Sequence, residues 1–203
     1  MEKSIALDEA KKQELYTAIY DDSMWLVNLT ENLLSVTRIE NGTMRIRMEP
    51  ELLEEVFQEA LSHLDRQSAN HRIQVELDDD LLMARMDVRL IVQVIINIVN
   101  NAIKYTQKGS RIQILTDKLG SDVRIRVTDD GPGIPDEAKP FVFDLCYTGA
   151  NRIADSRRSL GLGLCLCRSI IRAHGRDISV SDNTPSGCIF TFTLPCEEVA
   201  IHE

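Results

Sequence analysis

An apolar run from Leu90 to Tyr105 is interrupted by a single polar stripe, and this pattern dictates a buried helix. Asn97, Asn101 and Lys104 recur at i, i+4 and i+7, a spacing that places them on one face of an α-helix. Carboxamide oxygens suit a hard cation that keeps several waters, and a lysine ammonium provides a point charge for phosphate. The run therefore predicts a core helix whose polar face binds a magnesium-bound triphosphate.

A second motif follows an alternating strand, residues 123–127, and reads Asp-Asp-Gly-Pro-Gly at positions 129–133. Glycine adopts backbone conformations that are closed to other residues, so Gly131 and Gly133 allow the chain to approach a flat ligand. Asp129 stands at the end of the strand, where its carboxylate can accept a hydrogen bond from an exocyclic amine. That chemistry distinguishes adenine from guanine, and it makes Asp129 a candidate for base recognition.

A third motif, Gly-Leu-Gly-Leu at residues 161–164, begins a helix that we expect to extend to His174. The amide groups and the positive dipole end of a helix N-terminus form an anion site, where phosphates are expected. Each motif alone has an ordinary explanation: a solvated stripe, a turn between strands, or a glycine pair of low specificity. Together, in this order and in these contexts, they predict ATP binding.

The order and spacing of the motifs resemble the N, G1 and G2 boxes of the sensor histidine kinase ATP-binding domain. That family belongs to the gyrase, Hsp90, histidine kinase and MutL (GHKL) superfamily. Residues 142–147 are similar to its F box and residues 187–195 to its closing strand, while residues 29–42, reading LTENLLSVTRIENG, resemble the end of its dimerisation helix. The KdpD-type potassium-responsive sensors look like the nearest branch.

The resemblance implies ATP and Mg²⁺ as cofactors and a role for individual residues. Asn97, Asn101 and Lys104 would be catalytic, with Asn101 on the magnesium ion, Asn97 beside it on magnesium or phosphate, and Lys104 on phosphate. The residues that would bind ATP are Tyr105, Asp129, Gly131, Gly133, Ile134, Arg157, Arg158, Gly161, Leu162, Gly163 and Leu164.

Three positions depart from the family pattern: Ser159 replaces the glycine that usually begins the G2 box, Cys146 replaces the second phenylalanine of the F box, and Arg176 replaces a frequent glycine. Residues 144–160 contain few apolar side chains, and the segment is expected to close over the triphosphate as a lid. The alternative is a solvated loop in which Arg157 and Arg158 have no role.

The resemblance also implies the reaction. ATP-hydrolysing members of the superfamily carry a glutamate at the position of Asn97, and an amide cannot act as a general base. We therefore expect an ATP:protein-histidine phosphotransferase, which passes the γ-phosphoryl to a histidine of its dimerisation domain and then to an aspartate of a response regulator. Two alternatives remain. A GHKL ATPase is opposed by Asn97, whereas a degenerate nucleotide-sensing module is left open by Ser159 and Cys146.

The chain contains four histidines, and none is followed by the family's phospho-acceptor sequence. His174 precedes Gly175 and indicates a glycine-capped helix end, whereas His63 and His71 are expected in a polar helix tail. The acceptor histidine is therefore expected to lie outside this chain.

An apolar seam marks the N-terminal segment; its residues are Leu15, Ile19, Leu26, Leu29, Leu33 and Val36. The alternating spacing of four and three is typical of a bundle helix. We interpret residues 1–42 as the second helix of a dimerisation bundle, which forms a homodimer in the full-length protein, and residues 43–203 as the catalytic domain. The alternative is that the seam packs on its own domain.

Composition limits the partners. A formal charge of −9 argues against nucleic acid, whose phosphates require a basic face. No apolar run reaches membrane-spanning length, so we expect a cytoplasmic segment without membrane contact, although many relatives are anchored upstream. Five cysteines without a CxxC pair are expected to be reduced.

The predicted fold class is α+β: a two-layer α/β sandwich of the Bergerat type, in which helices cover one face of a mixed sheet, preceded by the bundle helix. Asp87 is expected to cap the helix that carries the polar stripe. The other expected elements are strands at 43–48, 72–77, 82–86, 111–118, 123–128, 177–181 and 188–194, and helices at 50–70 and 162–174.

Overall fold

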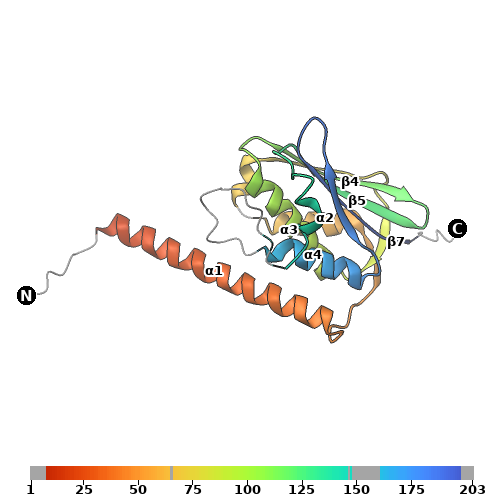
Figure 1. Cartoon of the computed structure of the whole chain (residues 1–203), viewed down its shortest axis with the longest axis horizontal. Coiled ribbons are helices and arrows are strands. Elements are labelled where there is room, and N and C mark those ends of the chain that lie inside the picture. Colours follow the sequence, from red (N-terminus) through yellow and green to blue (C-terminus); the bar gives the residue numbers. More distant parts are fainter. Residues whose placement is uncertain (1–7, 65, 146, 148–160, 198–203) are drawn as a thin grey trace, which may run out of the picture.

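The computed structural model describes residues 8–64, 66–145, 147 and 161–197 (Figure 1). The helices are α1 (Glu9–Glu40), α2 (Leu53–Ser62), α3 (Val88–Tyr105) and α4 (Leu162–Ala173), with 3₁₀ turns η1 (Arg66–Asn70) and η2 (Lys139–Phe141). The strands are β1 (Glu49–Leu52), β2 (Arg72–Glu76), β3 (Met83–Met86), β4 (Arg111–Leu119), β5 (Asp122–Asp129), β6 (Ile178–Asp182) and β7 (Cys188–Glu197).

These strands form one mixed sheet in the order β1-β3-β7-β5-β4-β2, with β6 also paired to β7. β2 and β4 run parallel, and the other pairs are antiparallel. β7 pairs with β5 along one edge and with β6 and then β3 along the other. Figure 1 shows α2, α3 and α4 on the same face of the sheet, as the predicted two-layer sandwich requires.

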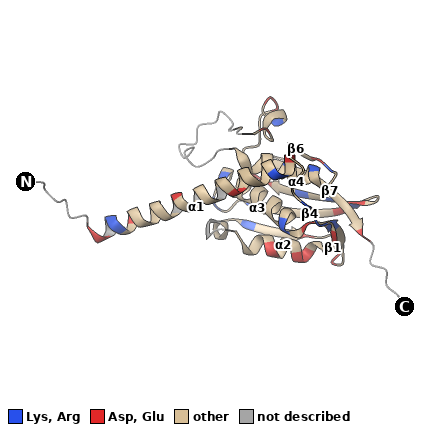
Figure 2. Cartoon of the chain, turned by 90° about the horizontal axis from the view of Figure 1, so that it is seen from below, with Lys and Arg blue, Asp and Glu red and all other residues tan. Residues whose placement is uncertain are grey.

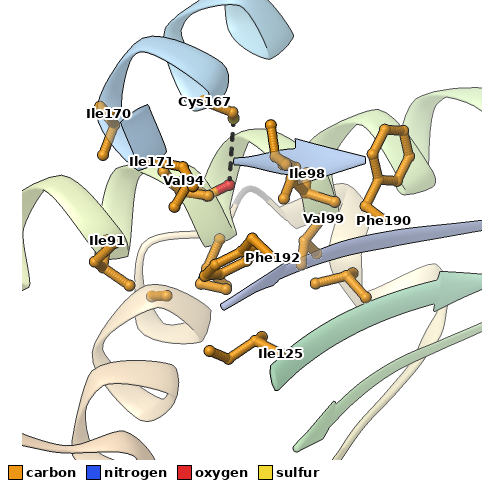
Figure 3. Close-up of a cluster of buried hydrophobic side chains, with 14 of the residues drawn as sticks. Ile91, Val94, Ile98, Val99, Ile125, Cys167, Ile170, Ile171, Phe190 and Phe192 are labelled. Carbon is orange, nitrogen blue, oxygen red and sulfur yellow. Dashed lines mark hydrogen bonds between the residues drawn. The ribbon is translucent and has the colours of Figure 1, made fainter. Parts of the chain in front are cut away.

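The core lies between that helical layer and the sheet (Figure 3). Ile91 and Ile98 of α3 and Ile170 of α4 face Ile125 and Phe192 from the strands, and all five are essentially inaccessible to solvent. Burying such a side chain contributes roughly 1.5–3 kcal/mol. Because α3 is buried on most of its circumference, its polar stripe is fixed relative to the sheet.

The segment that follows α1 differs from the sequence prediction. Residues 43–48 form no strand; the strand is β1, and the helix begins at Leu53 and ends at Ser62. Pro50 lies in β1, which pairs only with β3 among the described strands, and an edge strand tolerates proline. The buried face of α2 consists of Leu53, Val56, Phe57 and Ala60, whereas the nearby Leu52, Leu61 and Leu64 are partly exposed.

Asp87 occupies the N-cap position of α3, but its side chain does not cap the helix. Its Oδ2 instead accepts the backbone N–H of Arg47 at 3.1 Å, and its own backbone N–H donates to Nε2 of His174 at 3.0 Å. The backbone carbonyl of Asp87 receives the first helical amides. Asp87 therefore holds the segment after α1 and the end of α4 against the start of α3.

The end of α4 follows the prediction: His174 is the C-cap, and Gly175 follows with a φ of +76°. The imidazole is buried rather than solvated, and Nδ1 lies 2.8 Å from the carbonyl of Ile170. Arg176, one of the departures from the family pattern, forms a bidentate ion pair with Asp122 at the start of β5. Both side chains attach α4 to its surroundings.

Helix α1 ends at Glu40, with Asn41 as its C-cap, and its N-terminal part projects away from the rest of the molecule (Figure 1). Its C-terminal part packs against α4, where Val36 is 2 % exposed, and Asn32 accepts a hydrogen bond from Gln93 of α3. The alternative, that the seam packs on its own domain, holds within the described chain for Val36 at this end of the helix. Exposed apolar residues elsewhere on α1 are Leu15, Tyr16, Ile19, Tyr20, Met24, Leu26, Val27, Leu33 and Leu34.

Candidate functional site

The polar stripe of α3 lies at the surface of an otherwise buried helix. Asn97 and Asn101 are half-buried and Lys104 is exposed, whereas the intervening Ile98 and Val99 are fully buried. The 3.6-residue period of the helix thus separates apolar side chains, which are buried, from the two carboxamides, which lie at the edge of the core as predicted. Lys104 Nζ lies 5.1 Å from the ring centroid of the exposed Tyr105.

Asn97 faces the first turn of α4. A Cβ added at Gly163 would lie 3.6 Å from Asn97 Oδ1, so glycine allows the helix to approach the carboxamide closely. Asn97 Nδ2 is buried without an oxygen or nitrogen acceptor in the described chain. The neighbouring Cys167 thiol is a weak hydrogen-bonding group and donates to the Val94 carbonyl at 3.7 Å (Figure 3). An unsatisfied buried amide marks this place as one that a polar ligand can complete.

Asp129 ends β5 with its side chain 7 % exposed. Its Oδ1 accepts the backbone N–H groups of Gly131 at 2.9 Å and Cys188 at 3.3 Å. Within the described part of the chain, no group donates to Oδ2. Burial raises the pKa of this carboxyl, as does the charge of Asp130, while the two backbone hydrogen bonds oppose the rise. One oxygen is therefore fixed, and the other remains for a ligand donor.

Gly131 connects this carboxylate to the end of α3. A Cβ at Gly131 would lie 2.9 Å from Asp129 Oδ1, 2.9 Å from Thr106 Cγ2 and 3.5 Å from the Tyr105 carbonyl oxygen. The absence of a side chain here is what allows the three groups to meet. Since Asn97 of the same helix faces Gly163, the three sequence motifs converge around α3.

The remaining predicted residues of the site frame this centre. Gly133 has a φ of +78°, which favours glycine, and Ile134 packs partly buried against the core. Gly161, with a φ of +67°, is the N-cap of α4, and no side chain caps the helix there. Leu162 is buried and Leu164 packs against the core, so the first turn presents backbone amides rather than side chains.

Two predicted site residues, Arg157 and Arg158, lie outside the described residues, as do Ser159 and Cys146. The F box is described in part: Val142 and Phe143 are buried, and Phe143 contacts Phe190 edge-to-face with ring centroids 6.2 Å apart. Phe141 stacks on Tyr147 at 6.4 Å. The base of the predicted lid is therefore anchored in the core.

Sequence reasoning missed the turn between β6 and β7. Gly187 has a φ of +108°, and a Cβ there would lie 1.9 Å from the Asp129 carbonyl oxygen. Asn183 Nδ2 donates to that same oxygen at 2.8 Å. Nothing in the sequence pairs residues 54 positions apart. A glycine immediately before an alternating strand was the one local signal, and it is a common one.

Residues 86–198, more than half of the chain, match the family model described as histidine kinase-, DNA gyrase B-, and HSP90-like ATPase. The chain belongs to this family. It contains the ATP-binding catalytic domain of the sensor histidine kinases, as the N, G1 and G2 motifs had suggested.

Among curated relatives of this histidine kinase-type domain is the sensor protein KdpD of Clostridium acetobutylicum, which is 42% identical over 97% of this chain. The chain spans 22% of the length of that protein. Among solved structures, the nucleotide-free catalytic domain of histidine kinase ThkA is 31% identical, with a TM-score of 0.65 over 75% of this chain and 96% of that one.

ThkA in complex with the response regulator protein TrrA is 27% identical, with a TM-score of 0.69 over 94% of this chain and 53% of that one.

Two further features of the histidine kinase-type domain concern metal ligands and membrane-spanning helices. In the described residues, no three His, Cys, Asp or Glu side chains are grouped to hold a metal ion. None of the described helices is long and apolar enough to span a membrane.

Proposed function

We propose that this chain binds Mg-ATP and that, in its parent sensor kinase, it transfers the γ-phosphoryl group to a histidine of the dimerisation domain, from which it passes to an aspartate of a response regulator. The observation that carries the proposal is the environment of the Asp129 carboxylate. This buried carboxylate has one oxygen fixed by Gly131 and Cys188 and the other left for a donor. The exocyclic amine of adenine provides that donor, and Gly131 and Gly133 leave room for the base.

The phosphate end of the site is assigned to α3 and to the start of α4. Asn101, with Asn97 beside it, would supply amide oxygens to a magnesium ion, and Lys104 would neutralise phosphate charge. The residues fit such an ion, because magnesium commonly keeps waters and shares its coordination with substrate phosphates rather than requiring a cage of carboxylates. The orphaned Nδ2 of Asn97 would gain a phosphate oxygen or a coordinated water as its partner.

The amides that follow Gly161 would receive phosphate oxygens. Arg157 and Arg158 remain proposed lid residues. Transfer rather than hydrolysis is favoured because the side chain that faces Gly163, in the first turn of α4, is the Asn97 carboxamide, which cannot act as a general base toward water. ATP would persist until an external nucleophile arrives.

The domain division extends this proposal to the partners. We infer that residues 1–42 belong to the dimerisation domain and residues 43–203 to the catalytic domain. The exposed apolar side chains of α1 support this division, because such a stripe has to be covered in the whole protein. In Figure 2 most of the ribbon of α1 is tan, the colour of residues other than Lys, Arg, Asp and Glu. The ThkA–TrrA complex supports a response regulator as the second partner.

Nucleotide titration tests the binding step directly. The chain is titrated with ATP, with and without Mg²⁺, beside Asp129→Asn and Asn101→Ala, and the heat of binding is recorded. Asp129→Asn presents a donor where adenine also donates, so its affinity should fall about ten- to a hundredfold. Asn101→Ala should lose the dependence of affinity on magnesium. Unchanged affinity in Asp129→Asn would reject the assigned base site.

A second assay separates phosphotransfer from the alternatives. Labelled ATP is incubated with the chain and with an added four-helix bundle that carries an acceptor histidine, and acid-labile label on the bundle is measured. Transfer to the bundle is the expected outcome. Nucleotide binding without transfer would favour the sensing module, for which Ser159 and Cys146 are the sequence evidence, and release of phosphate alone would favour an ATPase.

A further inference from the structure

The turn between β6 and β7, residues 183–187, lies against the backbone of Asp129 rather than against a ligand-facing side chain. Asn183 Nδ2 donates to the Asp129 carbonyl oxygen at 2.8 Å. Asn183 Oδ1 accepts the backbone N–H of Thr184 at 2.9 Å, and the backbone N–H of Asn183 donates to the Gly187 carbonyl at 3.0 Å. Both ends of the carboxamide are engaged, so its orientation is fixed.

The next residues hold the side chain of the same aspartate. Gly187 packs so closely on the Asp129 carbonyl that no side chain fits, and the backbone N–H of Cys188 then donates to Asp129 Oδ1. Asp129 therefore accepts two hydrogen bonds from this region: its backbone carbonyl accepts one from Asn183, and its carboxylate accepts one from Cys188. Two attachments on one residue define a direction, which a single contact does not.

The turn is also attached to the chain that follows the glycine motif. Lys139 Nζ lies 2.5 Å from Asp182 Oδ2 and 2.5 Å from Asp136 Oδ1, and the lysine side chain is 17% exposed. Asp182 immediately precedes Asn183. The ion pairs therefore join the start of the turn to η2, which follows the glycine motif in the chain.

We propose that Asn183 is a positioning residue for base recognition: it fixes the backbone of Asp129 so that the free carboxylate oxygen, Oδ2, meets the exocyclic amine of adenine. The inference rests on the proposed ATP binding and deepens it, because it assigns the source of selectivity for a 6-aminopurine. Without Asn183 the carboxylate keeps its charge and its hydrogen bonds from Gly131 and Cys188, but the backbone that carries it loses the hydrogen bond at its carbonyl, so Oδ2 is held less precisely.

The test compares ATP with inosine triphosphate, which carries a carbonyl in place of the amine. Dissociation constants for both are measured for the unaltered chain and for Asn183→Ala, Asn183→Asp and Ser186→Ala. Asn183→Asp keeps the acceptor for Thr184 and hence the turn, but it lacks the donor to Asp129. Ser186 is an exposed residue of the same turn and provides the matched control.

The unaltered chain and Ser186→Ala should prefer ATP, and both Asn183 variants should lose about tenfold of that preference while their affinity for inosine triphosphate changes less than twofold. Equal weakening of both nucleotides, or a preference that Asn183→Asp retains, would overturn the positioning role. Asp129→Asn is measured alongside: if the unaltered chain has no preference for ATP, or if Asp129→Asn leaves it intact, the proposed base site itself fails, whatever Asn183 does.

Discussion

His174 joins three parts of the molecule through one imidazole. Nε2 accepts the backbone N–H of Asp87 and Nδ1 donates to the Ile170 carbonyl, an arrangement that requires the neutral ring with its proton on Nδ1. Burial lowers the pKa of His174, although the Ile170 carbonyl and the Asp87 carboxylate raise it in part. A second ring proton would remove the acceptor on which the Asp87 backbone depends.

Stability should therefore fall as the pH drops below neutrality. The folded pKa lies below the ordinary value of 6.5, so below about pH 6.5 the unfolded chain binds the proton first and the free energy of unfolding decreases. Above that pH His174 contributes no pH dependence. Urea unfolding at pH 7.5 and 5.5 should show a decrease that is smaller in His174→Gln, which keeps one donor and one acceptor but does not titrate. An equal decrease in both would contradict this assignment.

Gly187 is the residue where backbone geometry is most demanding. Gly187→Ala should reduce the free energy of unfolding by roughly 3 kcal/mol or more, because backbone strain and a steric overlap add. Gly120→Ala provides the control: its φ is +62°, nothing lies within 4 Å of the added Cβ, and the expected cost is roughly 1 kcal/mol. Equal losses in urea denaturation would show that the contact with Asp129 relaxes easily.

At the scale of elements, the sequence was a good guide where a regular pattern is long. α3, α4 and the β4–β5 hairpin at Gly120-Ser121 were predicted with nearly correct ends, because a sustained period and glycine punctuation act locally. In segment 43–70 the strand and the ends of the helix were predicted wrongly, because Pro50 enters an edge strand whose partner residues are 31 or more positions away. Asp87 was placed correctly at the cap, yet its side chain is bound to Arg47.

The same distinction applies to the candidate site. The sequence alone reveals the polar stripe of α3, the carboxylate of Asp129 and the glycines, because residues of these types are unusual at such positions. It does not reveal the turn that holds Asp129, because Asn183 and Gly187 are ordinary turn residues in any local window. Asn183 and Gly187 contact Asp129 only because the fold places β5 beside β7.

The apolar residues of α1 should differ in how much they contribute to stability. Val36→Ala, in the part that packs against α4, should destabilise the chain by roughly 1–3 kcal/mol, whereas Leu26→Ala, at an exposed position, should change stability by less than about 0.5 kcal/mol. Urea denaturation at low protein concentration measures both. A Leu26→Ala loss that grows with protein concentration would instead report self-association through α1.

At the scale of the whole molecule, β7 is both the last described strand and the one with most neighbours. It separates β5 from β6 and β3, and its first residue supplies an amide to Asp129. During synthesis from the N-terminus, β3 and β5 are made long before β7 and have exposed edges until residues 188–197 emerge. A nascent chain thus carries its N and G1 motifs before the candidate site is complete, and the Asp129 carboxylate gains its second amide only when residue 188 has been added and the sheet closes.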